Sequence, residues 1–314
     1  MVISRWLVAL LVVALGHSAI AGSRGTVGVT TLTFTKTSVT TGAPRVLETV
    51  IWYPAAGGGT IDVFGRRDAR VRRGRFPLVV FSHGTCGRPT EASYLTRALA
   101  AAGFVVAAPP HPGNTADDVP GCLGGPAFID SAVNREPDVA FVIDAMLAQS
   151  TDGSSRFAQR LRPEAIGVTG LSFGGFTTLL TALLEPRVTA ALALVPGGTA
   201  ALGMSNISIP TMVIGSERDQ VVGFAESESA YARLAGPRFL VELLAANHLS
   251  VVDSCSAGLA GLDLCVPGDI TQETAHALVL RYAVPFFRRY LGGRRAAART
   301  LRRQIDGVVL TADP

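Results

Sequence analysis

Short apolar runs alternate with longer amphipathic segments along most of this chain. Eight runs rich in Val, Ile, Leu and Phe have the length of β-strands, and they cover residues 26–35, 46–53, 78–82, 104–108, 166–169, 190–195, 211–214 and 238–243. Five segments with Ala and Leu at helical spacing predict helices at residues 90–102, 137–149, 173–184, 222–234 and 274–290. From the third apolar run onward strands and helices mostly alternate, which predicts a mainly parallel sheet covered by helices on both faces.

Three stretches depart from this alternation. No helix separates the first two runs, so we expect an antiparallel hairpin at one edge of an eight-stranded sheet. Residues 55–75 are rich in Gly and Arg and are expected to form a loop. Residues 109–135 are rich in Pro and Gly, and we expect an irregular segment there, where a substrate-binding loop would be placed.

The N-terminal residues have the three parts of a secretory signal. Arg5 precedes an apolar run at residues 6–16, and small residues at 19–21 form a cleavage site. The run is shorter than the roughly 20 residues of a spanning helix, so we expect cleavage, a secreted or periplasmic protein and no stable membrane insertion. Residues 22–293 then form one domain, followed by an Arg-rich tail at residues 294–314.

The chain contains four cysteines, an even number that in an exported protein favours disulfides over metal ligands. We expect Cys255 to pair with Cys265 because they close a short loop, which leaves Cys86 for Cys122. Free buried thiols are the alternative.

The formal net charge is +4, and arginines cluster at residues 66–75 and 288–303. A solvated loop and a solvated helix face account for these clusters. Because the chain contains no recognisable nucleic-acid-binding module, no nucleic-acid partner is expected.

A serine lies between a predicted strand and a predicted helix. Residues 170–174 have the form G-x-S-x-G, with Ser172 at the centre, and Gly175 follows. A tight strand-to-helix turn projects the serine hydroxyl, and the glycines leave room for it. Ser172 is therefore the predicted nucleophile.

A serine nucleophile needs a base, and His248 is the candidate among five histidines. It alone follows Ser172 in a loop after the last predicted strand. An exposed, inert histidine is the alternative, but the serine turn and the chain order favour a base. For such a turn the order along the chain is Ser, acid, His, which leaves Asp219 and, in reserve, Glu217, in the loop after residues 211–214. We choose Asp219 because it lies just before the next helix.

Two backbone N–H groups would have to stabilise the oxyanion of the transition state. One is the N–H of Phe173, which follows the nucleophile. The other is expected in the loop after residues 78–82, where Thr85 follows a His-Gly pair. An ordinary turn is the alternative reading of that pair.

With these motifs, the chain resembles the α/β-hydrolase superfamily over nearly all of its mature length. It looks like the branch that groups dienelactone-hydrolase-like proteins, platelet-activating-factor acetylhydrolases and polyester hydrolases. The supporting segments are residues 51–54 (Ile-Trp-Tyr-Pro), 78–84, 111–114 (His-Pro-Gly-Asn) and 170–175. Ser172 stands where dienelactone hydrolases proper have cysteine. Residues 195–198 contain no carboxylate where the acetylhydrolases place their acid, so Asp219 must serve.

These observations predict a monomeric, secreted serine hydrolase that cleaves a small-molecule or lipid-like carboxylic ester through an acyl-enzyme on Ser172. No cofactor and no metal are expected. An acyltransferase or amidase on the same fold, and a non-catalytic binding module, are the alternatives.

Overall fold

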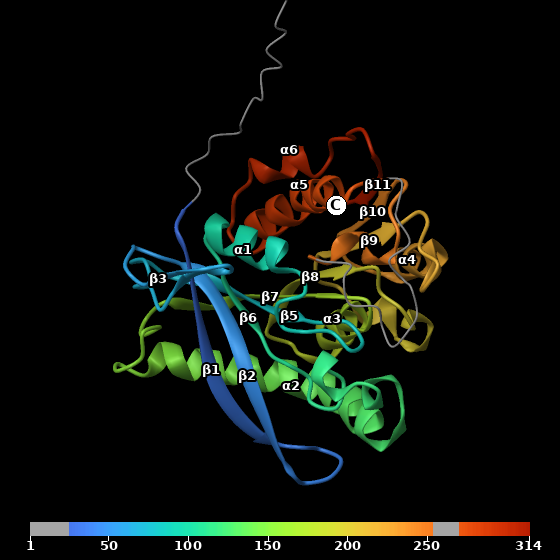
Figure 1. Ribbon diagram of the computed structural model, residues 1–314. Coiled ribbons are helices and arrows are strands. Elements are labelled where there is room, and N and C mark those ends of the chain that lie inside the picture. The colour runs from blue at the N-terminus through green and yellow to red at the C-terminus, as the bar shows by residue number, and fades with distance from the viewer. Residues whose placement is uncertain (1–24, 254–269) are drawn as a thin grey trace, which may run out of the picture.

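The structure is a computed structural model that describes residues 25–253 and 270–314 (Figure 1). The predicted signal sequence and the predicted disulfide between Cys255 and Cys265 lie outside the described residues.

One mixed sheet organises the described chain. Its strand order is β11-β10-β9-β8-β7-β5-β6-β2-β1-β4-β3. The strands are β1 (Val27–Thr37), β2 (Pro44–Pro54), β3 (Thr60–Asp62), β4 (Gly65–Arg67), β5 (Phe76–Ser82), β6 (Val105–Ala108), β7 (Leu161–Leu171), β8 (Val188–Leu194), β9 (Thr211–Ser216), β10 (Arg238–Leu243) and β11 (Val308–Asp313). The neighbours from β6 to β10 are parallel, and the flanking pairs β2–β6 and β10–β11 are antiparallel.

The eight predicted strands are present, but the expected number of strands was wrong. The strands β3 and β4 lie in the stretch predicted as a loop, and β1 is therefore not the edge of the sheet. Each has three residues and no buried one, so neither has an apolar signature. The third additional strand, β11, lies in the predicted Arg-rich tail and pairs with β10. As an edge strand it is mostly exposed, and pairing with β10 decides its structure.

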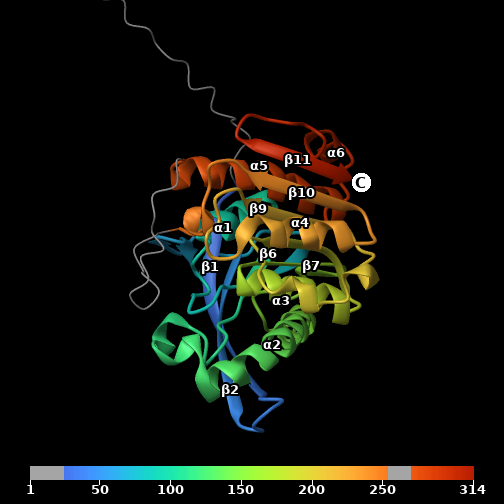
Figure 2. The ribbon, with the colours of Figure 1, turned by 90° about the vertical axis from the view of Figure 1, so that its right-hand side faces the viewer.

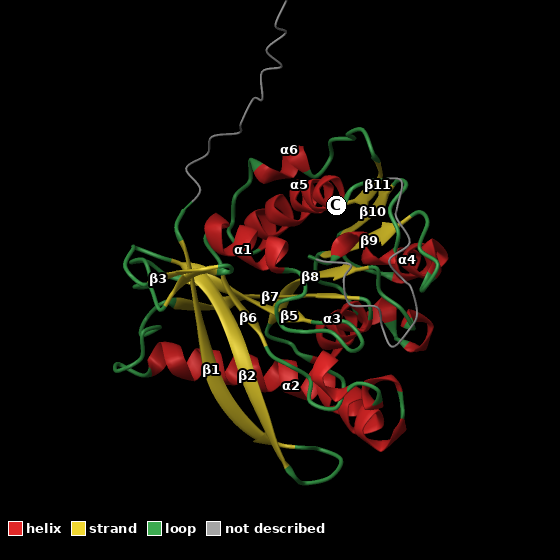
Figure 3. Cartoon of the chain, in the orientation of Figure 1, coloured by secondary structure: helices red, strands yellow, loops and turns green. Residues whose placement is uncertain are grey.

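Helices cover both faces of the sheet (Figures 1, 2 and 3). They are α1 (Ser93–Ala102), α2 (Gly125–Thr151), α3 (Phe173–Leu184), α4 (Gly223–Arg233), α5 (Gln272–Tyr290) and α6 (Ala297–Thr300). Short 3₁₀ helices occupy Ala116–Asp118, Gly121–Leu123, Thr199–Ala201, Met204–Asn206 and His248–Val251. In the described residues, no helix is both long and apolar enough to cross a membrane.

The helix α2 begins twelve residues earlier than Pro137, where its start was predicted. The buried positions in this extension include Ser131, Asn134 and Arg135. A helix whose buried face is polar has no hydrophobic periodicity, so the sequence pattern indicates a loop.

Alternating side chains of β5 enter two cores. Val79 and Phe81 pack with residues of α1 and α5, such as Leu95 and Phe286. Leu78 and Val80 pack on the opposite face with residues of α2. The sheet is therefore buried on both sides, as expected for parallel strands whose sequences are continuous apolar runs.

The packing of β11 can be tested with two adjacent valines. Val308 is 2% exposed, whereas Val309 is 44% exposed. We expect Val308→Ala to lower the free energy of unfolding by about 2 kcal/mol, and Val309→Ala by less than about 0.5 kcal/mol. Urea denaturation measures both. Equal effects would contradict the burial of β11 against β10.

Candidate active site

Ser172 occupies the turn between β7 and α3. Its backbone has φ 56° and ψ −116°, and its N–H donates to the carbonyl oxygen of Leu194 at 2.9 Å. A serine at positive φ is strained and needs support from its surroundings.

The glycines beside Ser172 are required by close backbone contacts. A Cβ atom at Gly174 would overlap the carbonyl oxygen of Ser82, at the end of β5. A Cβ atom at Gly170 would overlap the carbonyl oxygen of Gly174. The start of α3 therefore lies directly against β5 and β7, which fixes the turn that carries Ser172.

Asp219 and His248 form a direct hydrogen bond. The Nδ1 atom of His248 donates to Oδ2 of Asp219 at 2.7 Å, and the histidine is 5% exposed. The other carboxylate oxygen, Oδ1, accepts the N–H groups of Val221 and Val222, each at 2.9 Å. Burial by itself would raise the pKa of Asp219, but the His248 hydrogen bond and charge, together with these N–H groups, hold that pKa below its usual 3.8. Asp219 is therefore an ionised carboxylate that fixes the orientation of the imidazole.

The reserve acid, Glu217, has a different partner. Its Oε2 atom accepts the backbone N–H of Ala245 at 2.6 Å, in the turn that follows β10. The structure thus joins Asp219, rather than Glu217, to His248.

The three predicted residues follow parallel strands of one sheet. Ser172 follows β7, Asp219 lies after β9, and His248 lies after β10. The carboxyl ends of parallel strands meet at one edge, so all three residues lie along it. Asp219 and His248 are joined by their hydrogen bond, and Ser172 is positioned by its own turn.

The predicted oxyanion donors lie on two adjoining segments. Phe173 is the first residue of α3, where N–H groups have no partner within the helix. Thr85 is a central residue of a turn closed by the N–H of Gly87 and the carbonyl oxygen of Gly84, 3.2 Å apart. A Cβ atom built at Gly84 would lie 3.5 Å from Cβ of Ser172, so this turn lies beside the serine.

A buried arginine that the sequence analysis missed contacts both segments. Arg135, from α2, donates to the carbonyl oxygens of His83 at 2.7 Å and Gly84 at 3.1 Å. Its guanidinium lies 4.3 Å from the centre of the Phe173 ring. The side chain is 1% exposed. The signal available in the sequence was an arginine at the end of a Pro- and Gly-rich stretch, two residues before Pro137.

A second set of Ser, His and Asp side chains is hydrogen-bonded in series, and its serine, Ser82, ends β5 just before the turn of Thr85. Nε2 of His111 is 2.9 Å from Oγ of Ser82, and Nδ1 is 3.2 Å from Oδ2 of Asp138. Burial and then the charge of Arg135 lower the pKa of His111 to about 4, although Asp138 raises it. Ser82 is 2% exposed and both other residues are fully buried, so no substrate reaches this serine. These three hydrogen-bonded side chains therefore have a structural role.

Glu91, two residues before α1, contacts the turn that carries Thr85. A carboxylate oxygen of Glu91 accepts the N–H of Gly84. Burial raises the pKa of Glu91 to about 7, although the Gly84 N–H and the Arg135 charge act in the opposite direction. Glu91 and Arg135 therefore hold the donor and acceptor groups of Gly84 at once.

The predicted disulfide between Cys86 and Cys122 is present, with a Cα–Cα distance of 5.3 Å. It joins the turn after β5 to the 3₁₀ helix Gly121–Leu123. In the described part of the chain, no group of three or more His, Cys, Asp or Glu side chains could hold a metal ion.

Comparisons with known proteins give one family and one fold. The family profile described as "PETase: PET hydrolase-like" matches residues 18–261, which is more than half of the chain. A ferulic acid esterase from Streptomyces cinnamoneus has a similar solved structure, with a TM-score of 0.72 and 23% identity over 93% of this chain and 98% of that chain. At this identity the likeness shows the fold alone. A comparison with curated proteins gives no match.

The raised pKa of Glu91 predicts a pH-dependent stability. Between about pH 4.5 and 7 the folded state binds more protons at Glu91 than the unfolded state, so this group's contribution to stability is lost as the pH rises. Glu91→Gln should therefore gain stability relative to the natural protein between pH 4.5 and 7.5, by up to roughly 3 kcal/mol. Urea denaturation at both pH values measures the difference.

The matched control is Glu228→Gln, which removes one carboxylate from an exposed position of α4. If the control and Glu91→Gln change in parallel with pH, the assignment to Glu91 is wrong.

Proposed function

The chain belongs to the PET hydrolase-like family, and from that premise we propose that it hydrolyses carboxylic esters through an acyl-enzyme on Ser172. Its α/β-hydrolase fold and its place in the polyester-hydrolase-like branch, both predicted from the sequence, are confirmed by the family profile and the structural likeness. Ester hydrolysis is the activity that these relatives' names describe.

The proposed first step makes an ester bond to Ser172. His248 accepts the hydroxyl proton at Nε2 while Oγ attacks the ester carbonyl carbon. The N–H groups of Phe173 and Thr85 donate to the oxyanion of the tetrahedral intermediate. Collapse of that intermediate breaks the bond to the alcohol, which leaves with the proton from His248.

The second step returns the free enzyme. Water gives a proton to His248 and attacks the acyl carbon, and the acid product leaves as Ser172 regains its proton. Asp219 stabilises the imidazolium that forms in both steps. The observation that carries the proposal is the 2.7 Å hydrogen bond from Nδ1 of His248 to Asp219, which leaves Nε2 for the serine proton.

Arg135 acts in this proposal as a positioning residue. It touches neither substrate nor reacting atoms, but it binds the carbonyl oxygens on one side of Thr85 and lies over the ring of Phe173. Both oxyanion donors are thereby held relative to one another before substrate arrives, which avoids a reorganisation cost during the reaction.

We place the mature protein outside the cytoplasm. The Cys86–Cys122 disulfide supports this proposal, because disulfides persist in oxidising compartments. The predicted signal sequence supports it independently.

The nucleophile is tested with a p-nitrophenyl ester of a short-chain acid. We expect Ser172→Ala to lower kcat/KM by at least ~10³. A fluorophosphonate probe should label the natural protein at Ser172, as identified by peptide mass spectrometry. Retained turnover, or labelling at another serine, would show that the nucleophile lies elsewhere.

The acid is tested by two substitutions that remove a charge and keep the shape. Asp219→Asn should lower kcat by roughly 10²–10⁴ because the amide no longer stabilises the imidazolium and favours the wrong tautomer. Glu217→Gln keeps an acceptor for Ala245 and should change kcat less than about threefold. The reverse order of effects would assign the role to Glu217.

A further inference from the structure

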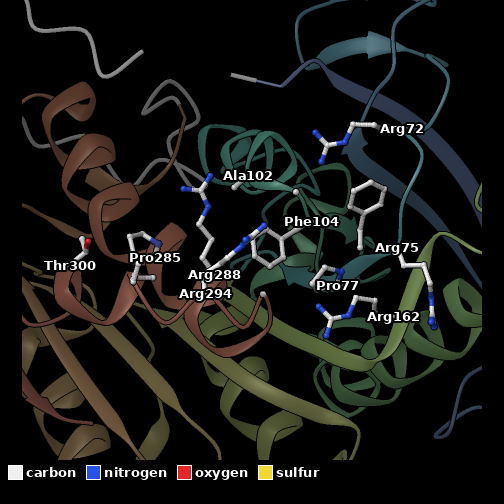
Figure 4. Close-up of a pocket in the computed structure, with 15 residues that line it drawn as sticks. Arg72, Arg75, Pro77, Ala102, Phe104, Arg162, Pro285, Arg288, Arg294 and Thr300 are labelled. Atoms are coloured by element: carbon white, nitrogen blue, oxygen red, sulfur yellow. The ribbon is translucent and has the colours of Figure 1, made fainter. Parts of the chain in front are cut away.

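A cavity of about 690 Å³ lies at the amino ends of the parallel strands, at the opposite edge from Ser172 (Figure 4). Phe76 and Pro77 begin β5, Arg162 lies near the start of β7, and Phe104 precedes β6. The end of α5 and the segment after it complete the wall.

Five of the fifteen lining residues are arginines and none is acidic. They are Arg72, Arg75, Arg162, Arg288 and Arg294, which Figure 4 shows around Phe104 and Pro77. The five arginines come from three segments that lie far apart in the sequence, at residues 72–75, 162 and 288–294. The fold thus unites the two Arg clusters for which solvated surfaces were expected.

In the described part of the chain, few carboxylates lie near these five arginines, and Glu164, whose charge interacts with Arg162 and Arg75, is one of them. Among the described residues, the ion pair made by these five arginines is that of Arg162 with Glu164, at 2.9 Å. Nε of Arg75 donates to the carbonyl oxygen of Leu161, and the guanidinium of Arg72 lies 5.2 Å from the centre of the Phe76 ring. Arg288 lies in the last turn of α5, where a positive charge is favoured by the helix dipole. The helix dipole does not account for the arginines from the other segments.

We propose that this cavity binds a polyanion that carries phosphate groups, of the diphosphate type. Several guanidinium groups can donate in pairs to one phosphate, which offers more acceptor oxygens and more charge than a single carboxylate. Arg72, Arg75, Arg288 and Arg294 are exposed, so a polyanion can reach them from solvent, and Phe76, Phe104 and Pro285 line the pocket beside them. The ligand is a free diphosphate or the head group of a phospholipid with two phosphate groups, since both present two phosphates to the same arginines.

This site is independent of the proposed hydrolysis. None of its lining residues belongs to the set of Ser172, Asp219 and His248, and Arg162 lies at the opposite end of β7 from Ser172. We therefore expect ester turnover to stay unchanged when anion binding is lost. If the hydrolase proposal fails, the proposal of an anion site still stands.

Isothermal titration of the mature protein with inorganic pyrophosphate tests the site. We expect saturable binding that weakens with added salt, and a rise in Tm with pyrophosphate concentration. The double variant Arg288→Gln/Arg294→Gln should bind at least ~10-fold more weakly, which corresponds to about 1.4 kcal/mol.

The matched control is Arg295→Gln/Arg299→Gln. It removes the same charge from exposed positions of the same segment that do not line the cavity. Its affinity should stay within about twofold of the natural protein, and the p-nitrophenyl ester activity of both double variants should be unchanged. No binding to the natural protein, or equal losses in the two double variants, would overturn the proposal.

Co-sedimentation with vesicles distinguishes the two sources of phosphate. Binding to vesicles that contain cardiolipin, which carries two phosphates, but not to phosphatidylcholine vesicles, with competition by pyrophosphate, identifies a head group. Pyrophosphate binding without vesicle binding identifies a free diphosphate. Citrate that binds as tightly as pyrophosphate would overturn the specificity for phosphate.

Discussion

Because the strands β6, β5, β7, β8, β9 and β10 run parallel, every loop that follows one of them leaves the sheet at the same edge. Ser172, Asp219 and His248 therefore lie along one edge of the sheet, although they span 77 positions of the sequence when both ends are counted. The same constraint sends the preceding loops to the opposite edge. The Arg-lined cavity forms there, so the proposed catalytic residues and the proposed anion site are separated by the length of the strands.

The carboxyl edge depends on a buried polar layer that an apolar core could not provide. Arg135 binds the turn that carries Thr85, and Asp138, one helical turn away, binds Arg45 at 2.8 Å and His111 at 3.2 Å. Burying such charges is costly, and removing one partner leaves another without compensation. The layer therefore joins α2 to β5 and to the turn after it through paired, buried polar groups. Arg135 links this layer to Phe173 through its contact with the ring.

Elements were predicted correctly where local residue patterns and structure have the same cause. The helix α3 was predicted with its observed bounds because the glycines around Ser172 and the apolar run after it act locally. The start of α2 and the strand β11 were missed, since the first buries polar groups and the second depends on pairing with β10. The contribution of Arg135 was missed for the same reason, because its partners lie about fifty residues earlier in the chain.

The sequence by itself determined the α/β class, the order of serine, acid and histidine, and the serine turn, because each follows from periodicity or from glycines at fixed spacing. Only the tertiary structure shows that His248 bonds to Asp219 and that Glu217 bonds to Ala245, because both acids lie in one loop and their partners come from a distant segment. It also decided that two arginine clusters line one cavity, since that proximity arises from β5, β7 and α5 packing together. Local patterns act over a few residues, whereas these outcomes depend on contacts between distant segments.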